Sequence, residues 1–190
     1  MTETPDLLRR WLSNAHPIGP AVRADWALAD LFARQISPAD APLILLGASA
    51  PSLAQLMIRN GVPPGNVALV EAGSELAASV QATHPAARLL WTSAVALATE
   101  DPFAGEKAGA VASVLPLRFL PVRKITLVLN AAFGHLRPGG ALYQVTSGQH
   151  CPVPDDLLRQ LGLVSAMVDA VETDGTIFTL YRLARGVDRC

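Results

Sequence analysis

The hydrophobic residues of this chain fall into short blocks that alternate with polar, helix-like stretches. The first five blocks lie at residues 43–46, 67–70, 87–91, 110–115 and 141–145. Blocks of this length, each followed by a turn or helix signal, are typical of a parallel sheet covered by helices on both faces. The pattern therefore predicts an α/β fold in which strands and helices alternate.

Two helices are expected to connect these strands. Residues 52–59 have apolar side chains at helical spacing and are followed by Asn60-Gly61, which is a signal for a helix C-terminus. Residues 122–136 repeat the helical spacing, and we expect Arg137-Pro138-Gly139-Gly140 to end that helix before the next strand begins. Each helix would cross from one parallel strand to the next.

The last third of the chain predicts an antiparallel hairpin. After a short helix at residues 155–161, two strand-like runs at 164–171 and 177–183 are joined by a segment that contains Asp174-Gly175. Asp-Gly between two such runs is a strong hairpin signal. We therefore expect a Rossmann-like seven-stranded sheet, mostly parallel with a C-terminal antiparallel hairpin, rather than an ordinary dinucleotide-binding domain that would continue with parallel units.

Residues 1–40 precede the predicted sheet and have a helical pattern. Leu7, Leu8, Trp11 and Leu12 lie close together on this pattern with Arg9-Arg10 beside them. Such a helix suits either contact with a membrane interface or packing on the sheet. A length of 190 residues at 51% hydrophobic composition fits one domain, with an α/β core at residues 41–185.

Charge and cysteine content narrow the classes of partner. Fifteen basic and 16 acidic residues give a formal charge of -1, so no overall field favours nucleic acid or an anionic membrane. Cys151 and Cys190 form no disulfide framework, and neither they nor the four histidines have metal-ligand spacing. The N-terminal residues lack the pattern of a secretory signal, and no segment has the roughly 20 apolar residues of a membrane span. We expect a cytoplasmic protein without a metal, soluble or peripheral to a membrane.

The first candidate site follows the first and second strands. Ligands of doubly wound sheets bind beyond the carboxyl ends of the strands. There Gly47 lets the backbone approach a nucleotide-type ligand closely, although the loop taken alone favours a tight strand-to-helix turn with Pro51 at the start of the helix. Glu71 ends the second strand, where a carboxylate can accept hydrogen bonds from both hydroxyls of a ribose. A solvated carboxylate at a helix N-terminus is the alternative, and the position of Glu71 one β/α unit after Gly47 favours the ribose.

At this point the sequence resembles a known family. The segments that carry the resemblance are Leu45-Leu46-Gly47, Gly61-Val62-Pro63-Pro64, Val67-Ala68-Leu69-Val70-Glu71, Leu115-Pro116-Leu117 and the stretch from Leu136 to Gln144. In this order they resemble bacterial phospholipid N-methyltransferases, over about Leu8 to Arg185. The resemblance implies a class I methyltransferase fold with S-adenosylmethionine (SAM) as cofactor and phosphatidylethanolamine as acceptor, and a relation to the ribosomal RNA adenine dimethyltransferases.

The resemblance also assigns roles to individual residues. It implies that Gly47 lies against the methionine part of SAM, that Glu71 holds the ribose, and that Leu115, Pro116 and Leu117 line the pocket near the transferred methyl group. The rRNA enzymes hold a flipped base with an Asn or Asp followed by Pro and an aromatic residue. Val114 and Leu117 stand at the corresponding ends here, so methylation of a nucleic-acid base is disfavoured.

Several positions depart from the family's cofactor-binding pattern. The first loop of the family usually reads Glu-Leu-Gly-Pro-Gly-Thr-Gly, whereas this chain has Leu45 at the Glu, Ser49 at the second Gly and Pro51 at the third. Ser93 stands where the family places an Asp that accepts a hydrogen bond from the adenine amino group; a serine can make that bond more weakly. Losing the loop carboxylate costs about 1.5–3 kcal/mol, which predicts an affinity for SAM lowered by about tenfold to a few hundredfold.

Two hypotheses for function follow. The first is a SAM-dependent methyltransferase that transfers a methyl group to an amine on a small-molecule or lipid acceptor. Displacement at a sulfonium mainly requires alignment of donor and acceptor, so the sequence assigns no catalytic residue. The second is a catalytically inactive methyltransferase-like binding module with a decayed SAM site. The sequence predicts no oligomeric state.

Overall fold

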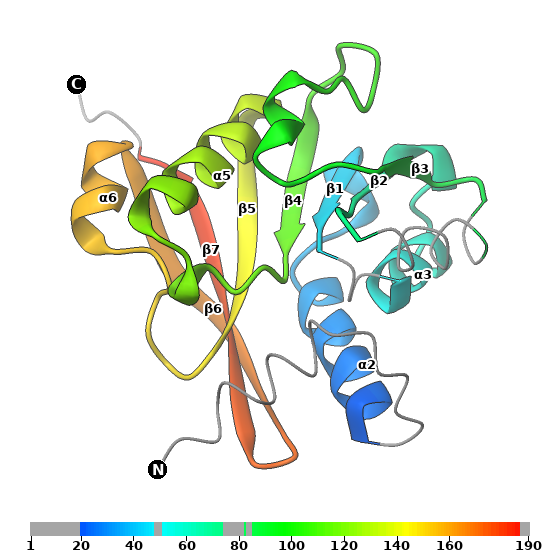
Figure 1. The fold of residues 1–190 in the computed structure, drawn as a ribbon. Helices are drawn as coiled ribbons and strands as arrows, with labels where there is room; N and C mark the ends of the chain where they lie inside the picture. The colour runs from blue at the N-terminus through cyan, green and yellow to red at the C-terminus, as the bar shows by residue number, and fades with distance from the viewer. Residues whose placement is uncertain (1–19, 48–50, 74–81, 83–84, 187–190) are drawn as a thin grey trace.

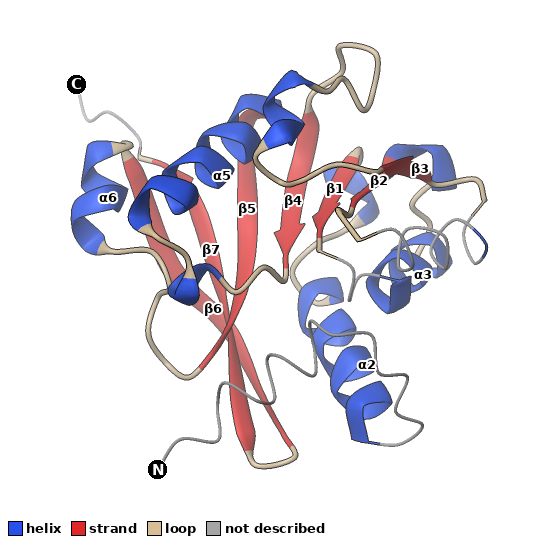
Figure 2. Cartoon of the chain, in the orientation of Figure 1, coloured by secondary structure: helices blue, strands red, loops and turns tan. Residues whose placement is uncertain are grey.

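The computed structural model describes residues 20–47, 51–73, 82 and 85–186. Seven strands form one sheet in the order β3-β2-β1-β4-β5-β7-β6 (Figures 1 and 2). Their bounds are β1 Leu43–Leu46, β2 Val67–Val70, β3 Arg88–Leu90, β4 Ala108–Ser113, β5 Leu136–Ser147, β6 Leu163–Thr173 and β7 Thr176–Arg185. The first five strands are parallel, and β7 runs antiparallel between β5 and β6. The predicted mostly parallel sheet with a C-terminal antiparallel hairpin is confirmed.

Helices cover both faces of this sheet. Helices α2 (Pro20–Ala33) and α3 (Pro51–Arg59) pack on one face, and α5 (Val122–His135) and α6 (Asp155–Gln160) pack on the other. Alternate residues of β1 reach opposite cores: Leu43 and Leu45 join the α2/α3 core, whereas Ile44 and Leu46 join the α5/α6 core. Because both faces are covered, all four residues of β1 are buried, which explains its continuous apolar run. Four short 3-10 helices lie in the connections: η1 Pro38–Asp40, η2 Pro64–Asn66, η3 Ala96–Thr99 and η4 Leu117–Phe119.

Two of the predicted chain reversals have the expected local geometry. At the end of α3, Gly61 has φ +102°, and the amide of Val62 donates to the carbonyl of Met57 (3.0 Å), a pattern typical of a glycine-terminated helix. In the β6–β7 hairpin, Asp174 and Gly175 both have positive φ, at 49° and 73°. Two such residues in a row suit the two-residue hairpin turn that matches the twist of the strands.

The motif Arg137-Pro138-Gly139-Gly140 corrects one prediction. It does not form a turn between α5 and the strand, because β5 already begins at Leu136, directly after the helix. Leu136 pairs with Ala108 and the next paired residue is Ala141, opposite Ala110, so the motif lies in an irregular stretch opposite Gly109. The extra residues bulge out of the ladder. The bulge lets the Arg137 guanidinium donate to the carbonyls of Ala39 (2.8 Å) and Ala41 (3.2 Å).

The N-terminal segment is described only in part. Residues 20–33 form α2, whose Leu28, Leu31 and Phe32 are buried as the apolar pattern predicts. Leu7, Leu8, Trp11 and Leu12 lie outside the described residues, so contact of that stretch with a membrane or with the sheet stays a prediction. In the part of the chain that the structure describes, no helix is long and apolar enough to cross a membrane.

One ion pair joins α2 to the hairpin. The Arg34 Nε lies 2.8 Å from Asp169 Oδ2 on β6, and the Nη1 of the same guanidinium lies 2.8 Å from Asp30 Oδ2. Partial burial acts to raise the pKa of Asp169, but the hydrogen bonds from Arg34 and from the amide of Ala170, together with the charge of Arg34, hold this pKa below its ordinary value of 3.8.

We expect Asp169→Asn to lower the free energy of unfolding by about 0.5–1 kcal/mol at neutral pH, because it removes this ion pair from a partly exposed site. A carboxyl whose pKa is lowered on folding stabilises the protein above its unfolded-state pKa and loses that effect as the pH falls through the folded value. Urea unfolding at neutral pH and well below pH 3.8 should therefore show a difference between variant and wild type that disappears in acid. A difference that persists unchanged in acid would contradict this explanation.

Candidate functional site

Gly47 and Glu71 lie side by side at the carboxyl ends of two neighbouring strands. Leu46 of β1 pairs with Val70 of β2, and the amide of Gly47 donates to the carbonyl of Val70 (3.1 Å). Each of the two residues is therefore the first beyond its strand. The β4 arrowhead in Figure 1 points to the lower part of the view, so this carboxyl edge of the parallel strands faces downward there. The structure brings together the first two residues that the sequence singled out.

Gly47 is required by its backbone conformation and by the two residues that follow β4. Its φ is +95°, a left-handed conformation that favours glycine. A Cβ at this position would lie 2.8 Å from Val114 Cγ2 and 3.4 Å from Leu115 Cδ2. The segment after β4 therefore approaches the first loop closely, and only a residue without a side chain fits between them.

The carboxylate of Glu71 is partly buried and held in place by its own loop. Its Oε1 accepts a hydrogen bond from the amide of Gly73 (2.7 Å), and its backbone amide donates to the carbonyl of Leu90 at the end of β3 (3.1 Å). Its Oε2 has no hydrogen bond within the described residues. Glu71 thus presents one oxygen that can accept hydrogen bonds from a ligand at the sheet edge.

Trp91 is a further candidate site residue, which the sequence pattern did not single out. It follows directly after β3 and is 67% exposed, while its indole Nε1 donates to the carbonyl of Ala72 (3.2 Å). This bond fixes an exposed aromatic ring next to the loop of Glu71. The available signal was an aromatic residue at the end of the third apolar block, two positions before Ser93, which was interpreted only as part of the strand.

The segment Leu115-Pro116 turns sharply at the end of β4. The strand ends at Ser113, two residues earlier than the apolar block suggested, because Leu115 is held by bonds outside the ladder. Its amide donates to Ser113 Oγ (3.3 Å), and its carbonyl accepts from Gln144 Nε2 (2.8 Å) and from the amide of Leu117 (2.8 Å). Leu115 and Pro116 are both half-buried, beside Gly47 at the same edge.

The side chain of Gln144 on β5 stabilises this turn by a hydrogen bond to its backbone. The side chain is fully buried, and its Nε2 donates to the carbonyls of Leu115 (2.8 Å) and Val145 (2.6 Å), while its Oε1 is buried without a hydrogen-bond partner. The sequence gives no signal for this role, because a single glutamine within an apolar strand does not reveal which backbone it will meet.

We expect Gln144→Leu to lower the free energy of unfolding by about 1 kcal/mol, since it removes two buried hydrogen bonds and the unpaired Oε1 offsets only part of that loss. Urea unfolding would measure it. Gln160→Leu, at the exposed end of α6, is the matched control and should change stability by less than about 0.5 kcal/mol. A Gln144 variant as stable as this control would show that the side chain does not hold Leu115.

Comparison with known proteins gives structural likeness without sequence likeness. No protein-family model and no curated protein sequence matches the chain. The magnesium protoporphyrin IX methyltransferase of Synechocystis PCC 6803, solved with bound SAM, is similar at a TM-score of 0.65 and 14% identity, covering 97% of this chain and 92% of that one. The 1,6-didemethyltoxoflavin-N1-methyltransferase of Burkholderia thailandensis, solved with bound 1,6-didemethyltoxoflavin and S-adenosylhomocysteine, is similar at a TM-score of 0.61 and 17% identity. This match covers 96% of this chain and 83% of that one. An O-methyltransferase family protein from the same organism is similar at a TM-score of 0.61 and 17% identity. The match covers 88% of this chain and 58% of that protein's chain.

The chain has the class I methyltransferase fold. The strand order β3-β2-β1-β4-β5-β7-β6 with an antiparallel β7 agrees with this assignment. The class I methyltransferase fold expected from the sequence is therefore confirmed. At 14–17% identity the likeness is one of fold. Within this fold, Gly47, Glu71, Trp91 and Leu115-Pro116 all lie at the carboxyl edge of β1 to β4.

The remaining residues that the sequence analysis singled out either contact other parts of the protein or lie outside the described residues. Ser93 is exposed, and its Oγ accepts a hydrogen bond from the amide of Ala96 (3.2 Å) at the start of η3. Leu45, which stands where the family has a glutamate, is 1% exposed in the α2/α3 core. Ser49 lies outside the described residues. Tyr143 of β5, a tyrosine on the fifth predicted strand that could have faced the acceptor, packs against the α2/α3 core as a sheet-face residue.

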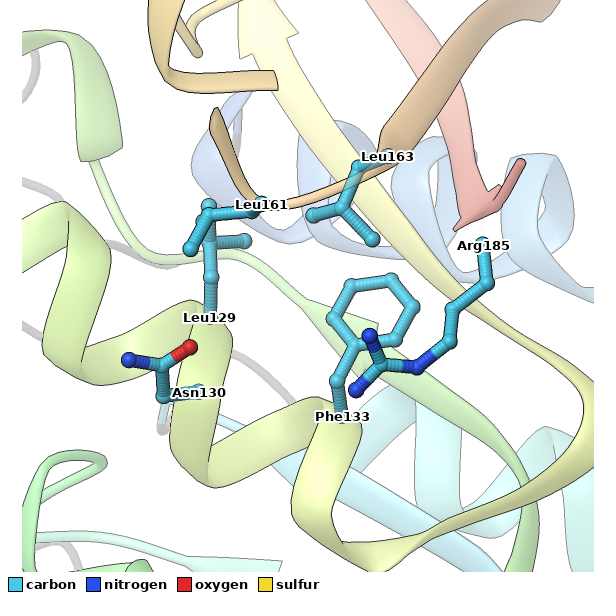
Figure 3. A pocket seen from close by; sticks show the side chains of 6 residues that line it. All are labelled: Leu129, Asn130, Phe133, Leu161, Leu163 and Arg185. Atoms are coloured by element: carbon cyan, nitrogen blue, oxygen red, sulfur yellow. The ribbon is translucent and has the colours of Figure 1, made fainter. Parts of the chain in front are cut away.

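Two hollows of the fold lie away from this edge. A small one of about 10 Å³, between α5, β6 and β7, is lined by Leu129, Phe133, Leu163 and Arg185 among others (Figure 3). A larger one of about 790 Å³ lies where β5 and β6 begin and β7 ends. Since β7 is antiparallel, these three ends meet at the amino edge of the sheet, opposite Gly47 and Glu71.

Proposed function

We propose that this chain is a SAM-dependent methyltransferase that transfers a methyl group to an amine acceptor, of the phospholipid N-methyltransferase type. The observation that carries the proposal is that Gly47 and Glu71 directly follow the paired residues Leu46 and Val70 of β1 and β2, at the edge where open α/β sheets bind their ligands. The solved relatives of this fold with bound SAM or S-adenosylhomocysteine support the choice of cofactor.

The residues at this edge suit the parts of SAM in turn. Gly47 offers a backbone surface without a Cβ for the methionine part, and Ser49 follows it in the loop. The Oε2 of Glu71, which has no hydrogen bond within the described residues, suits the ribose hydroxyls, because a carboxylate makes strong hydrogen bonds to them. Trp91 offers an aromatic face, and Ser93 a hydroxyl, for the adenine.

The chemistry asks little of the protein beyond alignment. SAM, when bound, supplies an electrophilic methyl group on a sulfonium. The lone pair of a neutral amine forms the new N–C bond as the S–C bond breaks, the sulfur keeps that electron pair as a thioether, and the amine proton leaves to solvent. Leu115 and Pro116 are proposed to wall this position, because apolar groups exclude water from a positioned amine. We assign no catalytic residue.

We propose phosphatidylethanolamine as the acceptor from the sequence resemblance and from the apolar character of Leu115 and Pro116. Phosphatidylethanolamine carries a primary amine whose neutral form is the nucleophile, and the apolar turn of Leu115-Pro116 suits an uncharged amine better than a protonated one. A lipid acceptor would require contact with a membrane surface, for which residues 7–12 remain the candidate segment. Nucleic acid remains disfavoured as an acceptor.

Two measurements test the proposal at its two levels. Isothermal titration with S-adenosylhomocysteine tests the cofactor, and saturable binding is the expected result. Transfer of labelled methyl from SAM to vesicles of phosphatidylethanolamine tests the acceptor. Phosphatidylcholine vesicles are the control, because their nitrogen is already fully methylated. Label in the control lipid alone, or in neither lipid, would contradict the phospholipid acceptor, whereas binding without transfer would leave the cofactor assignment standing.

A binding module with a decayed SAM site is the second candidate. It is favoured by the altered first loop, by the apolar Leu45 in place of a carboxylate, and by the hydroxyl of Ser93, which already holds the turn before η3. Absence of heat at millimolar S-adenosylhomocysteine, from a protein that unfolds cooperatively, would make this candidate the better one.

A further inference from the structure

Arg118 joins the two chain segments that follow β4 and β5. It lies in η4, which begins directly after Leu115-Pro116. Its Nη1 donates a hydrogen bond to the carbonyl of Ser147 (2.8 Å), the last residue of β5. Because β4 and β5 are parallel neighbours, both segments leave the sheet at its carboxyl edge. Arg118 therefore lies at the edge that also carries the proposed cofactor site.

The strand order places Arg118 on the acceptor side of this edge. The residues proposed for the cofactor, Gly47, Glu71 and Trp91, follow β1, β2 and β3. On the other side of β1, the sheet continues with β4 and β5. A cofactor over β1 to β3 leaves the ends of β4 and β5 to the acceptor, with Leu115-Pro116 at the boundary. In this respect the role inferred below for Arg118 rests on the proposed function.

Two contacts orient the guanidinium of Arg118. Besides the bond to Ser147, it lies over the ring of Phe119, with 5.3 Å between the guanidinium carbon and the ring centroid. The bond to Ser147 uses Nη1, whereas the edge formed by Nε and Nη2 has no hydrogen bond within the described residues. A guanidinium edge of this kind binds the oxygens of an anion as a fork. Because the side chain is exposed and already oriented, an anion that binds it spends little conformational entropy on ordering it.

No carboxylate among the described residues forms an ion pair with Arg118. The ion pairs of the described residues are those of Arg34 and Arg159. The sequence from Lys107 to Pro154, which supplies β4, η4, α5 and β5, contains no aspartate or glutamate. The whole chain has a formal charge of -1, so this basic segment departs from the overall balance. An anion that binds Arg118 therefore meets no competing carboxylate from the same segment.

We propose that Arg118 selects the acceptor by binding a phosphate ester that the acceptor carries close to its amine. A phosphate ester offers two oxygens to the fork of Nε and Nη2. In an ethanolamine phosphate, two carbons and an ester oxygen separate the amine from the phosphorus. This short link suits the spacing of Arg118 and the Leu115-Pro116 wall, which lie two residues apart in the chain. Arg118 is thus a specificity-determining residue, and lipid head groups and soluble esters share the chemistry that it binds.

An NMR titration tests the binding of phosphate without requiring methyl transfer. The signal to follow is the Nε–H of Arg118 in 15N-labelled protein, assigned by its loss in Arg118→Lys. The probes are O-phosphoethanolamine, inorganic phosphate and ethanolamine. We expect the signal to shift and saturate with both phosphates and to stay in place with ethanolamine, which lacks the anion. No shift with O-phosphoethanolamine, or an equal shift with ethanolamine, would overturn the proposal.

Methyl transfer to vesicles of phosphatidylethanolamine tests the selection of the acceptor. Arg118→Gln is expected to raise KM for the acceptor about tenfold and to change kcat by less than about twofold, because the phosphate is bound equally before and during the transfer. Arg118→Lys keeps the charge without the fork and should restore part of the loss. Arg123→Gln removes an exposed arginine from the first turn of α5 and is the matched control for charge. Its KM should stay within about twofold of the wild type.

Further measurements separate this role from a structural one and from the proposed function. Arg118→Gln should bind S-adenosylhomocysteine as the wild type does. A parallel loss of that affinity, or an equal rise of KM in Arg123→Gln, would overturn the assignment. Transfer to vesicles or to soluble O-phosphoethanolamine identifies whether the phosphate belongs to a lipid or to a free ester. Absence of transfer to either acceptor contradicts the proposed function, whereas the NMR titration still decides whether Arg118 binds phosphate.

Discussion

Alanine at Gly109 is expected to destabilise the fold by about 3 kcal/mol or more, the largest effect of any single methyl group considered for this chain. Gly109 is buried in β4, where its amide donates to the carbonyl of Pro42 (3.0 Å). A Cβ there would lie 2.2 Å from the carbonyl oxygen of Asp40 and 2.7 Å from Arg137 Nη2. The backbone at Asp40 cannot move away without breaking the hydrogen bonds that Arg137 donates to the carbonyls of Ala39 and Ala41 on either side of it.

Urea unfolding compared between Gly109→Ala and Gly134→Ala checks this prediction. Gly134 lies in α5, and a Cβ added there would meet no atom of a neighbouring element within 4 Å, so alanine should leave stability unchanged or raise it by up to about 1 kcal/mol through helix propensity. The two variants add the same methyl group and differ only in what it meets. Equal unfolding midpoints would mean that β4 and η1 do not approach each other as described.

Alanine at Glu71 is expected to lower the affinity for S-adenosylhomocysteine by about a hundredfold, because hydrogen bonds to a charged group are worth about 1.5–3 kcal/mol. The carboxylate is already oriented by the amide of Gly73, so a ligand that meets it spends little conformational entropy on ordering it. Isothermal titration of both proteins measures the difference.

Glu106→Ala is the matched control, since it removes an exposed carboxylate from the loop before β4. Its affinity should equal that of the wild type. An unchanged affinity in Glu71→Ala would remove the ribose assignment, and a parallel loss in the control would attribute the effect to net charge.

The sequence was sufficient for the architecture because strand and helix periodicity is local. Apolar runs such as residues 43–46 are buried on both faces, and the pattern around Asp174-Gly175 is a turn signal that two backbone angles confirm. The neighbouring positions of Gly47 and Glu71 also followed, because parallel strands end at the same edge of a sheet.

What the sequence could not give depends on contacts between distant segments. The bulge at Arg137-Pro138-Gly139-Gly140 forms because Gly109 and the carbonyls before β1 lie opposite it, and no local pattern reports that. Gln144 and Trp91 act through the backbone of Leu115 and Ala72, far from them in the chain. Their roles became visible only with the packed structure.

The central claim is that the carboxyl edge beside Gly47 and Glu71 binds the cofactor. The most direct test is a two-dimensional 15N–1H NMR titration with S-adenosylhomocysteine. It follows the amides of Gly47, Glu71 and Gly73 and the indole N–H of Trp91. We predict that these signals shift together and saturate, while the amide signals of Arg182 and Arg185 at the amino edge stay in place. Shifts confined to the amino edge, or no shifts at millimolar ligand, would contradict the account.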